Sequence, residues 1–209
     1  RSFSFTPFKI FLILFFGFSA MGFSQISVNL DTGTSWTVPC GVNTITVEVW
    51  GAGGAGGRIT NNPASAGGGS GGGYVKRSFA VNSNQIIPYS IGTGGNGGTG
   101  TKNGTASWFM SNTTLLAVGG NGAANSTVSG FLGTGASAPT SGNIGGIIIS
   151  GYGGNGGTAT NVGVDYSGGG GSSGGSTAAG NAVGRIGGIA PTDGYAGADG
   201  RNEITPITG

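Results

Sequence analysis

Two stretches of the chain match the G-x-G-x-x-G spacing with which a strand-to-helix turn can cradle a pyrophosphate. They begin at Gly51 and Gly151, each directly after a predicted strand. A dinucleotide site also needs a helix N-terminus immediately after the glycines, to receive the phosphates. Neither residues 58–63 nor the β-branched and turn residues after Gly157 predict a helix. We therefore interpret both glycine sets as structural and expect no bound cofactor.

Side chains for nucleophilic, acid–base or metal chemistry are scarce. The chain has no histidine and one cysteine, so histidine-dependent triads and zinc sites lack their residues. The six carboxylates are scattered, and only the tail with Asp193, Asp199 and Glu203 gathers several of them. That tail lacks the spacing of known calcium loops. We expect no catalytic residue and no metal site, and hence a protein that is not an enzyme.

The single cysteine, Cys40, follows Pro39. A lone cysteine cannot form an internal disulfide. We interpret it as a small buried apolar residue, because free cysteine is among the most buried residue types. The alternative is a disulfide to a second chain.

Glycine supplies 51 of the 209 residues, and it recurs as G-x-G triplets in residues 51–57, 92–100 and 151–157. A period of three matches the polyproline II helix, which makes no internal hydrogen bonds. Two of its three edges would carry no side chain here, so neighbouring backbones can approach and bond to one another. The predicted glycine helices contain Gly51, Gly53, Gly54, Gly56, Gly92, Gly94, Gly95, Gly97, Gly98, Gly151, Gly153, Gly154 and Gly156.

The segments between the glycine stretches alternate apolar and polar residues, which is typical of strands. Residues 44–50 show this pattern most clearly, and Pro88 indicates a sheet edge or a strand end. No helical apolar stripe is present, so we predict an all-β fold, a sandwich that clamps a bundle of glycine helices at both ends. Strands are expected at 36–38, 44–50, 74–81, 87–91, 106–110, 114–118 and 147–150. The predicted core contains Trp36, Val38, Ile45, Val47, Val49, Ile91, Trp108 and Phe109.

The first 24 residues are typical of a secretory signal peptide, with Lys9, an apolar run from Ile10 to Phe16 and small residues up to Ser24. The run is short for a membrane span. We predict a signal peptide at 1–24 and a glycine-rich β domain at 25–209, secreted or at the cell surface, with further domains beyond Gly209 left open.

Cleavage at this point changes the charge of the chain. Losing Arg1 and Lys9 from the eight basic residues leaves six, equal to the six acidic residues. Scattered basic residues on a neutral chain do not favour nucleic acid. Low net charge also offers little repulsion against self-association.

The order of strands and glycines resembles a known family. The stretches 36–39 and 47–54 resemble the opening of secreted bacterial glycine-rich domains, and 71–75, 89–95 and 115–120 continue the pattern in the same order. The pattern is also similar to the glycine-rich region of the anaplastic lymphoma kinase and leukocyte tyrosine kinase receptor ectodomains. The resemblance implies a jelly-roll-like β-sandwich with polyproline II glycine helices. No kinase region follows, so signalling is not implied.

We expect a non-enzymatic extracellular module, structural, adhesive or ligand-binding, on a rigid glycine scaffold. The partner would be a protein or glycan, with Tyr152 and Tyr195 as candidate contacts, and self-association is a further possibility. Alternatives are an ice-binding protein, in which Thr and Ala at third positions form a flat face, or a non-catalytic accessory domain of a larger exported protein. The signal segment argues against a phage-like tail-tip receptor binder.

Overall fold

The structure is a computed structural model that describes residues 25–59, 64–97, 102–126, 133–146, 149–158, 168–183 and 186–198. The chain divides into two compact units, Arg1–Asp31 and Thr32–Gly209. The described part of the first unit, residues 25–31, contains neither helix nor strand. The predicted signal peptide lies outside the described residues. The fold described below is that of the second unit.

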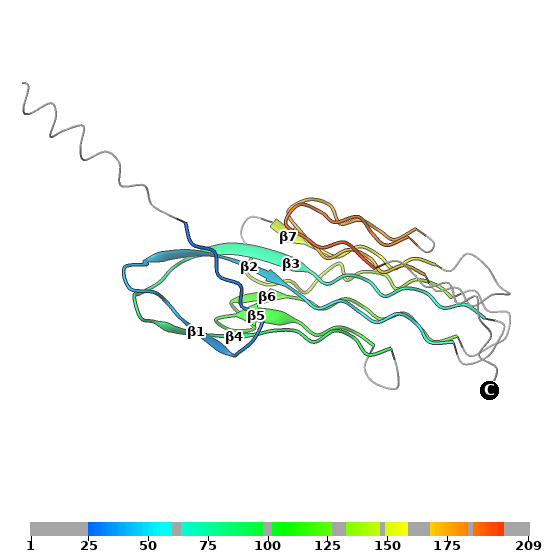
Figure 1. Ribbon diagram of the computed structural model, residues 1–209, viewed down its shortest axis with the longest axis horizontal. Helices are drawn as coiled ribbons and strands as arrows, with labels where there is room; N and C mark the ends of the chain where they lie inside the picture. Colours follow the sequence, from blue (N-terminus) through cyan, green and yellow to red (C-terminus); the bar gives the residue numbers. More distant parts are fainter. Residues whose placement is uncertain are drawn as a thin grey trace, which may run out of the picture. The chain divides into compact units, whose positions relative to one another are not determined.

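The second unit contains two antiparallel sheets, and its described residues form no helix (Figure 1). This confirms the prediction of an all-β, sandwich-like fold. In one sheet the strand order is β1-β4-β5-β6, and in the other it is β2-β3-β7. The strands are β1 (Ser35–Thr37), β2 (Thr44–Trp50), β3 (Tyr74–Ala80), β4 (Ile86–Ser90), β5 (Ser107–Phe109), β6 (Leu115–Ala117) and β7 (Ile149–Gly151).

A small apolar core lies between the two sheets. Leu115 and Val75 are fully buried, and the rings of Phe79 and Phe109 approach to 6.2 Å between centroids. Of the predicted core residues, Val38, Val49 and Phe109 are buried, whereas Trp36, Ile45, Val47 and Trp108 are half-buried.

The prediction that Ile91 belongs to the core is wrong, because 40% of its surface is exposed. The alternation of Ile87, Tyr89 and Ile91 suggested one buried face, and the first two are indeed buried. Strand β4 ends at Ser90, however, so Ile91 already belongs to the exposed glycine segment that leaves the sheet.

Pro88 lies in a strand that is internal to its sheet, because β4 pairs with β1 on one side and β5 on the other. The β4–β5 pairing includes only Tyr89 and Ser90, so Pro88 is located at the end of that ladder. Its carbonyl still accepts a hydrogen bond from the Met110 amide at 2.9 Å. Proline has no N–H to return this bond, so the exchange between the two residues stays incomplete and the ladder ends at this pair.

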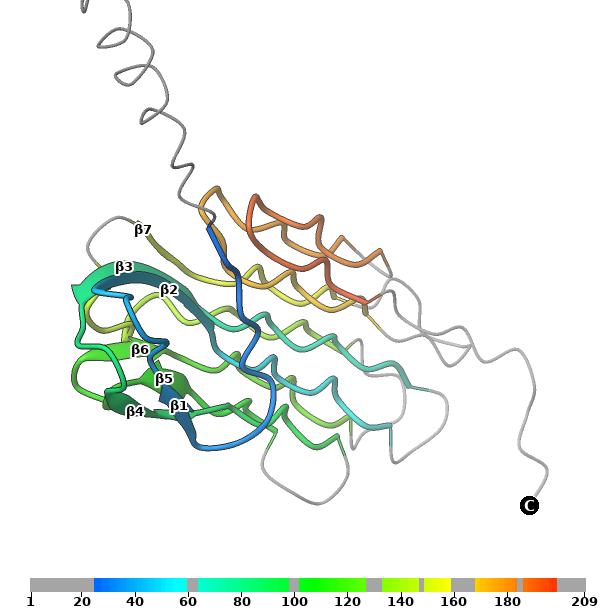
Figure 2. The same ribbon diagram turned by 60° about the vertical axis from the view of Figure 1, so that its left-hand side comes forward.

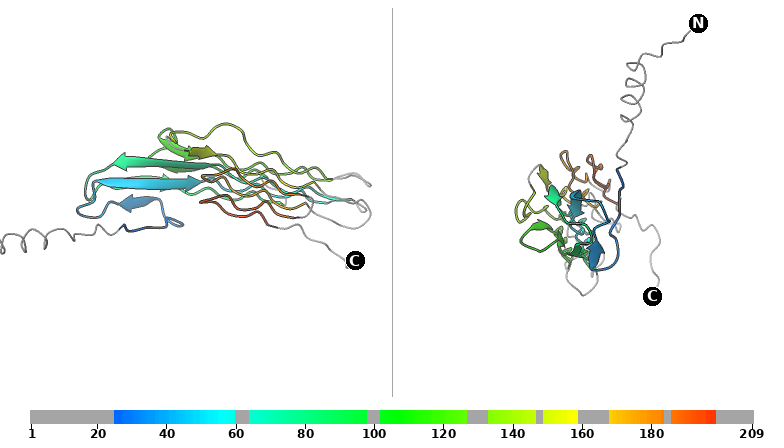
Figure 3. Two further views of the ribbon diagram at one scale, coloured as in Figure 1. Left: turned by 90° about the horizontal axis from the view of Figure 1, so that it is seen from above. Right: turned by 90° about the vertical axis from the view of Figure 1, so that its left-hand side faces the viewer.

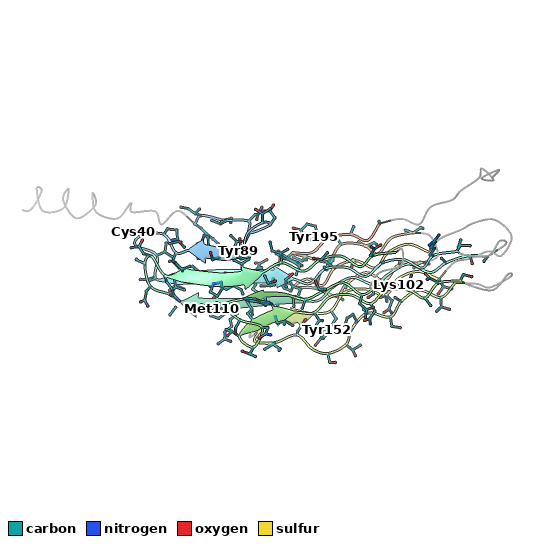
Figure 4. All side chains as sticks on the ribbon, turned by 90° about the horizontal axis from the view of Figure 1, so that it is seen from below. Cys40, Tyr89, Lys102, Met110, Tyr152 and Tyr195 are labelled. Carbon is teal, nitrogen blue, oxygen red and sulfur yellow. The ribbon has the colours of Figure 1, made fainter. Side chains whose placement is uncertain are left out.

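Cys40 is exposed, so the interpretation as a buried apolar residue is wrong (Figure 4). It lies in the turn between β1 and β2, which is closed by a hydrogen bond from the Val42 amide to the Pro39 carbonyl at 3.2 Å. Gly41 follows with φ of +81°, a left-handed conformation that suits glycine. The tight turn leaves the cysteine side chain at the surface.

Strands β2, β4, β6 and β7 continue into glycine segments that run away from the sheets, and other segments return (Figures 1 and 2). Within the described ranges of the second unit, the strands lie at one end of these segments (Figure 3). For these residues the expectation of a sandwich that orders both ends of the glycine segments is therefore wrong. Their order away from the sheets depends on contacts among the segments themselves.

The burial pattern predicts a clear contrast between two aliphatic residues. Leu115→Ala is expected to lower the free energy of unfolding by about 2–5 kcal/mol, because it empties a buried site. Ile91→Ala is expected to change it by about 0.5 kcal/mol or less, as at other exposed positions. Urea denaturation of both variants measures this, and equal losses would contradict the assignment of the core.

Candidate functional site: the glycine bundle and the adjoining sheet face

The pairing of the strands continues into the glycine segments without a change of register. The last pair of the β2–β3 ladder joins Trp50 to Tyr74, and the glycines that follow stay paired in the same order. Only the spacing of the hydrogen bonds along the chain changes, from every second residue in the strands to every third residue in the glycine segments. The amides of Gly51, Gly54 and Gly57 donate to the carbonyls of Gly73, Ser70 and Gly67, each at 2.9 Å.

The glycine segments also bond between layers, which the sheets themselves do not do. Packed sheets are separated by side chains and stand about 10 Å apart. In the bundle, the Gly120 and Ala123 amides donate to the carbonyls of Ala52 and Ala55 at 2.8 and 2.9 Å, from one layer to the other. Side chains no longer separate the layers, so main chain bonds directly to main chain.

The central segment of the bundle is 64–73, in which every residue is buried. It bonds with segments on several sides, including 51–57, 118–121 and 154–157. The three-residue repeat appears once more in the bonds between the central segment and residues 168–174. The amides of Gly168, Gly171 and Gly174 donate to the carbonyls of Ala66, Gly69 and Gly72 at 2.8, 3.0 and 2.8 Å.

Ser70 and Asn121 link the central segment to its neighbour, and sequence reasoning did not select either residue. The Asn121 amide donates to the Ser70 hydroxyl at 2.8 Å, and the Ser70 amide donates to the Asn121 carbonyl at 2.9 Å. The only available signal was the single serine that interrupts the glycines of residues 67–73. The hydroxyl of this serine accepts a hydrogen bond that a glycine at the same position could not accept.

At many positions only glycine fits, because the backbone of a neighbouring segment occupies the space that a Cβ atom would need. A Cβ atom at Gly68 would overlap the carbonyl oxygen of Gly169, and one at Gly71 would overlap that of Ser172. Among the predicted glycines, Gly51, Gly54, Gly92, Gly95, Gly153, Gly154 and Gly156 are equally confined by backbone atoms. Gly151 is the last residue of β7, and Gly98 lies outside the described residues.

Four of the predicted glycines, Gly53, Gly56, Gly94 and Gly97, are not confined. All four are exposed, and a Cβ there would meet no atom closer than 3.5 Å. Within the described part of the chain, their amides donate no hydrogen bond. The Gly95 amide donates to the Gly53 carbonyl at 3.0 Å, so the two segments that carry them are neighbours. We call these four residues the open edge of the bundle.

A second distinctive surface is the face of β2 and β3 that points away from the other sheet. Cross-strand pairs line it: the Thr46 and Ser78 hydroxyls lie 2.9 Å apart, and Lys76 forms an ion pair with Glu48 at 2.6 Å. The hydrogen bond with Glu48 raises the pKa of Lys76. Trp50 follows at the end of β2.

An aromatic cluster closes this face at the point where the glycine bundle begins. The Trp50 ring lies 5.3 Å from the Tyr74 ring and 5.8 Å from the Tyr195 ring, the latter edge-on. The Trp50 indole N–H donates to the Asp193 carbonyl at 2.9 Å. Tyr195 is 67% exposed, whereas Tyr152 follows β7, which lies on the other side of β3 from β2 and Trp50 (Figure 4). The structure therefore does not bring the two predicted tyrosine contacts together.

The acidic residues and glycine sets that the sequence analysis considered as catalytic, metal or nucleotide sites do not form such a site in the described residues. The Asp193 carboxylate accepts a hydrogen bond from the Ser176 hydroxyl at 2.7 Å, and Asp199 and Glu203 lie outside the described residues. The described ranges hold no group of three or more potential metal ligands. Beyond the two G-x-G-x-x-G sets, residues 57–59 and 157–158 are not helical. No helix in the described ranges is long and apolar enough to cross a membrane.

These features define a class of protein, an all-β domain whose sheets extend into a hydrogen-bonded bundle of glycine segments. The family model described as "glycine-rich domain" matches residues 29–208, and the chain belongs to that family. Comparison with curated proteins and with solved structures gives no significant match.

The steric difference between the glycines predicts opposite effects of one methyl group. Gly68→Ala is expected to lower the free energy of unfolding by about 1–3 kcal/mol, because backbone atoms occupy the space of the new Cβ. Gly53→Ala is expected to raise it by about 0.4–1 kcal/mol, because the methyl group fits and the unfolded chain loses freedom. Denaturant unfolding measures both. A loss at Gly53 as large as at Gly68 would contradict this packing.

Tyr74 predicts how stability depends on alkaline pH. Burial raises the pKa of its hydroxyl well above the ordinary value of 10.0, and the charges of Glu48 and Asp193 raise this pKa further. The folded state thus holds the proton more tightly than the unfolded state. The contribution of the Tyr74 hydroxyl to the free energy of unfolding is complete below pH 10. It is lost as the pH rises from there towards the pKa of the folded state.

Tyr74→Phe tests this dependence. Each proton released on unfolding contributes about 1.4 kcal/mol per pH unit to the slope. Unfolding free energies measured from about pH 9.5 to about pH 11 should fall less steeply in the variant by up to this amount. Lys76 is present in both proteins and cancels in the comparison. Parallel curves would show that Tyr74 makes no such contribution.

Proposed function

We propose that this protein is a non-enzymatic module that works outside the cell or on its surface, where a rigid glycine scaffold holds structural, adhesive or ligand-binding faces in place. The observation that carries the proposal is the buried segment 64–73, which is hydrogen-bonded to segments on several sides. Glycine-rich chain of this composition is ordinarily flexible. Hydrogen bonds that cross-link it in more than one direction are expected to make it stiff.

We infer that the extended glycine segments are polyproline II helices. The three-residue repeat of the bonds between segments supports this, because such a helix returns each residue to the same side every third position. A polyproline II helix has no internal hydrogen bonds, so it needs neighbours to satisfy its main chain. Bundling of the segments supplies those neighbours.

Export to the extracellular space is supported by the sequence. The apolar run after Lys9, with small residues behind it, is typical of a secretory signal. The resemblance to secreted bacterial glycine-rich domains points the same way. After cleavage the chain would carry equal numbers of acidic and basic residues, which suits contact between molecules more than solubility.

The open edge is the part of the scaffold best suited to self-association. Its amides lie on side-chain-free residues, like those of an edge strand that can template a partner. Residues 51–57 and 91–97 carry no charged side chain themselves, and among the described residues the charge placed at this edge is the Lys102 ammonium group, which donates to the Gly56 carbonyl at 3.3 Å. Seven residues at about 3.1 Å each make a contact roughly 20 Å long, which is small for an interface. We expect weak association, with a dissociation constant on the order of 0.1–1 mM.

Alanine at all four positions of the open edge tests this contact. The variant Gly53→Ala, Gly56→Ala, Gly94→Ala, Gly97→Ala should fold, because each Cβ has room. We expect sedimentation velocity to detect concentration-dependent association of the unchanged chain and to show that the variant has lost it. The added methyl groups prevent close approach of a second backbone. Association that is equal in both proteins, or absent from both, would exclude the open edge as a contact.

Ice binding is a second candidate, because exposed Thr93 and the half-buried Ala52 and Ala55 occupy third positions on regularly spaced segments. A measurement of thermal hysteresis distinguishes ice binding from the scaffold function. If a concentrated solution of the protein shows no hysteresis, ice binding is excluded. An accessory role in a larger exported protein is compatible with the same scaffold, and the gene sequence beyond Gly209 decides it.

A further inference from the structure

The outer face of β2 and β3, together with the aromatic cluster beside it, forms a shelf with a polar floor and an aromatic wall. The floor is made of the Thr46–Ser78 and Glu48–Lys76 pairs, and the wall of Trp50 and Tyr195. Strand spacing of about 3.4 Å per residue makes the floor roughly 14 Å long from residue 46 to residue 50. We propose that this shelf binds a neutral oligosaccharide.

The wall offers an apolar ring surface that the fold does not use. Tyr195 is 67% exposed although it is a large aromatic residue, and it comes from a segment more than a hundred residues away from Trp50. Its position is fixed: the Trp50 indole holds the neighbouring Asp193 carbonyl at 2.9 Å, and the Tyr195 amide donates to the Ser173 hydroxyl at 2.7 Å. An aromatic ring held in this way suits the apolar face of a sugar ring.

The floor offers hydrogen-bond donors and acceptors together. Two hydroxyls, a carboxylate and an ammonium group lie along it, and Thr46 and Ser78 are exposed. Glu48 and Lys76 remain about 30% exposed, so both can bond outward while they bond to each other. Sugar hydroxyls both donate and accept, and such a mixed floor matches them.

Charge decides among the possible ligands. Glu48 and Lys76 compensate each other, and Asp193 contributes the remaining charge at the wall while it accepts from Ser176. Nucleic acid or an acidic peptide would need clustered basic residues here. A lipid would need a larger apolar surface than one exposed tyrosine beside a half-buried tryptophan. A neutral saccharide needs neither.

Titration of the full chain with neutral oligosaccharides of glucose, mannose and N-acetylglucosamine tests the proposal, with calorimetry and Trp fluorescence as readouts. We expect at least one series to bind and Tyr195→Ala to weaken its binding about tenfold or more. Tyr195→Phe should retain most of the affinity, because the ring remains. Ile91→Ala, which removes an exposed apolar side chain beside the other sheet, is the control and should bind normally.

Thr46→Ala examines the floor independently and should weaken binding several-fold without disturbing the aromatic wall. Absence of binding by every neutral series up to its solubility limit would overturn the proposal, as would unchanged binding in Tyr195→Ala. Binding of acidic oligosaccharides alone would also overturn it. The inference rests on the proposed role as a binding module. A chain that binds no sugar but still self-associates through the open edge would refute the shelf and leave the scaffold proposal intact.

Discussion

The fold depends on hydrogen bonds between main chains that approach each other from more than one direction. A β-sheet satisfies its main chain within one plane, and side chains on both faces keep neighbouring sheets apart. Without Cβ atoms a segment can bond to neighbours within its layer and also across layers. The central segment 64–73 meets this condition, since glycine or small residues face each neighbour. Glycine loses much conformational freedom on ordering, so these bonds offset a large entropic cost.

The sandwich and the bundle are one hydrogen-bonded system. Because the β2–β3 register continues from Trp50 and Tyr74 into Gly51 and Gly73, the strand pair fixes which glycines meet further along. The apolar core between the sheets, with Leu115 and Val75, anchors the strands at one end of the segments. Beyond the strands, where apolar side chains become few, main-chain bonds replace the hydrophobic core.

This division leaves distinct surfaces for function. Interior glycines such as Gly68 cannot change without disturbing the bundle, whereas the open edge and the shelf carry no such constraint. A scaffold held by its own main chain frees its exposed side chains, Tyr195 above all, for contacts with other molecules. If the scaffold is as stiff as we propose, binding of a partner would cost less conformational entropy.

Local pattern in the sequence was enough to predict the all-β class, strand β2 at residues 44–50 and the period-three glycine segments, because alternation and triplet spacing are properties of adjacent residues. It failed at Ile91 and Cys40, whose exposure depends on where a strand ends and how a turn points. Nor could it distinguish Gly54 from Gly53, since the difference lies in which remote backbone each one faces. Only the tertiary structure decided that difference, and only it placed Tyr195 against Trp50, because contacts between distant segments follow from the packing of the whole chain and not from the order of neighbours.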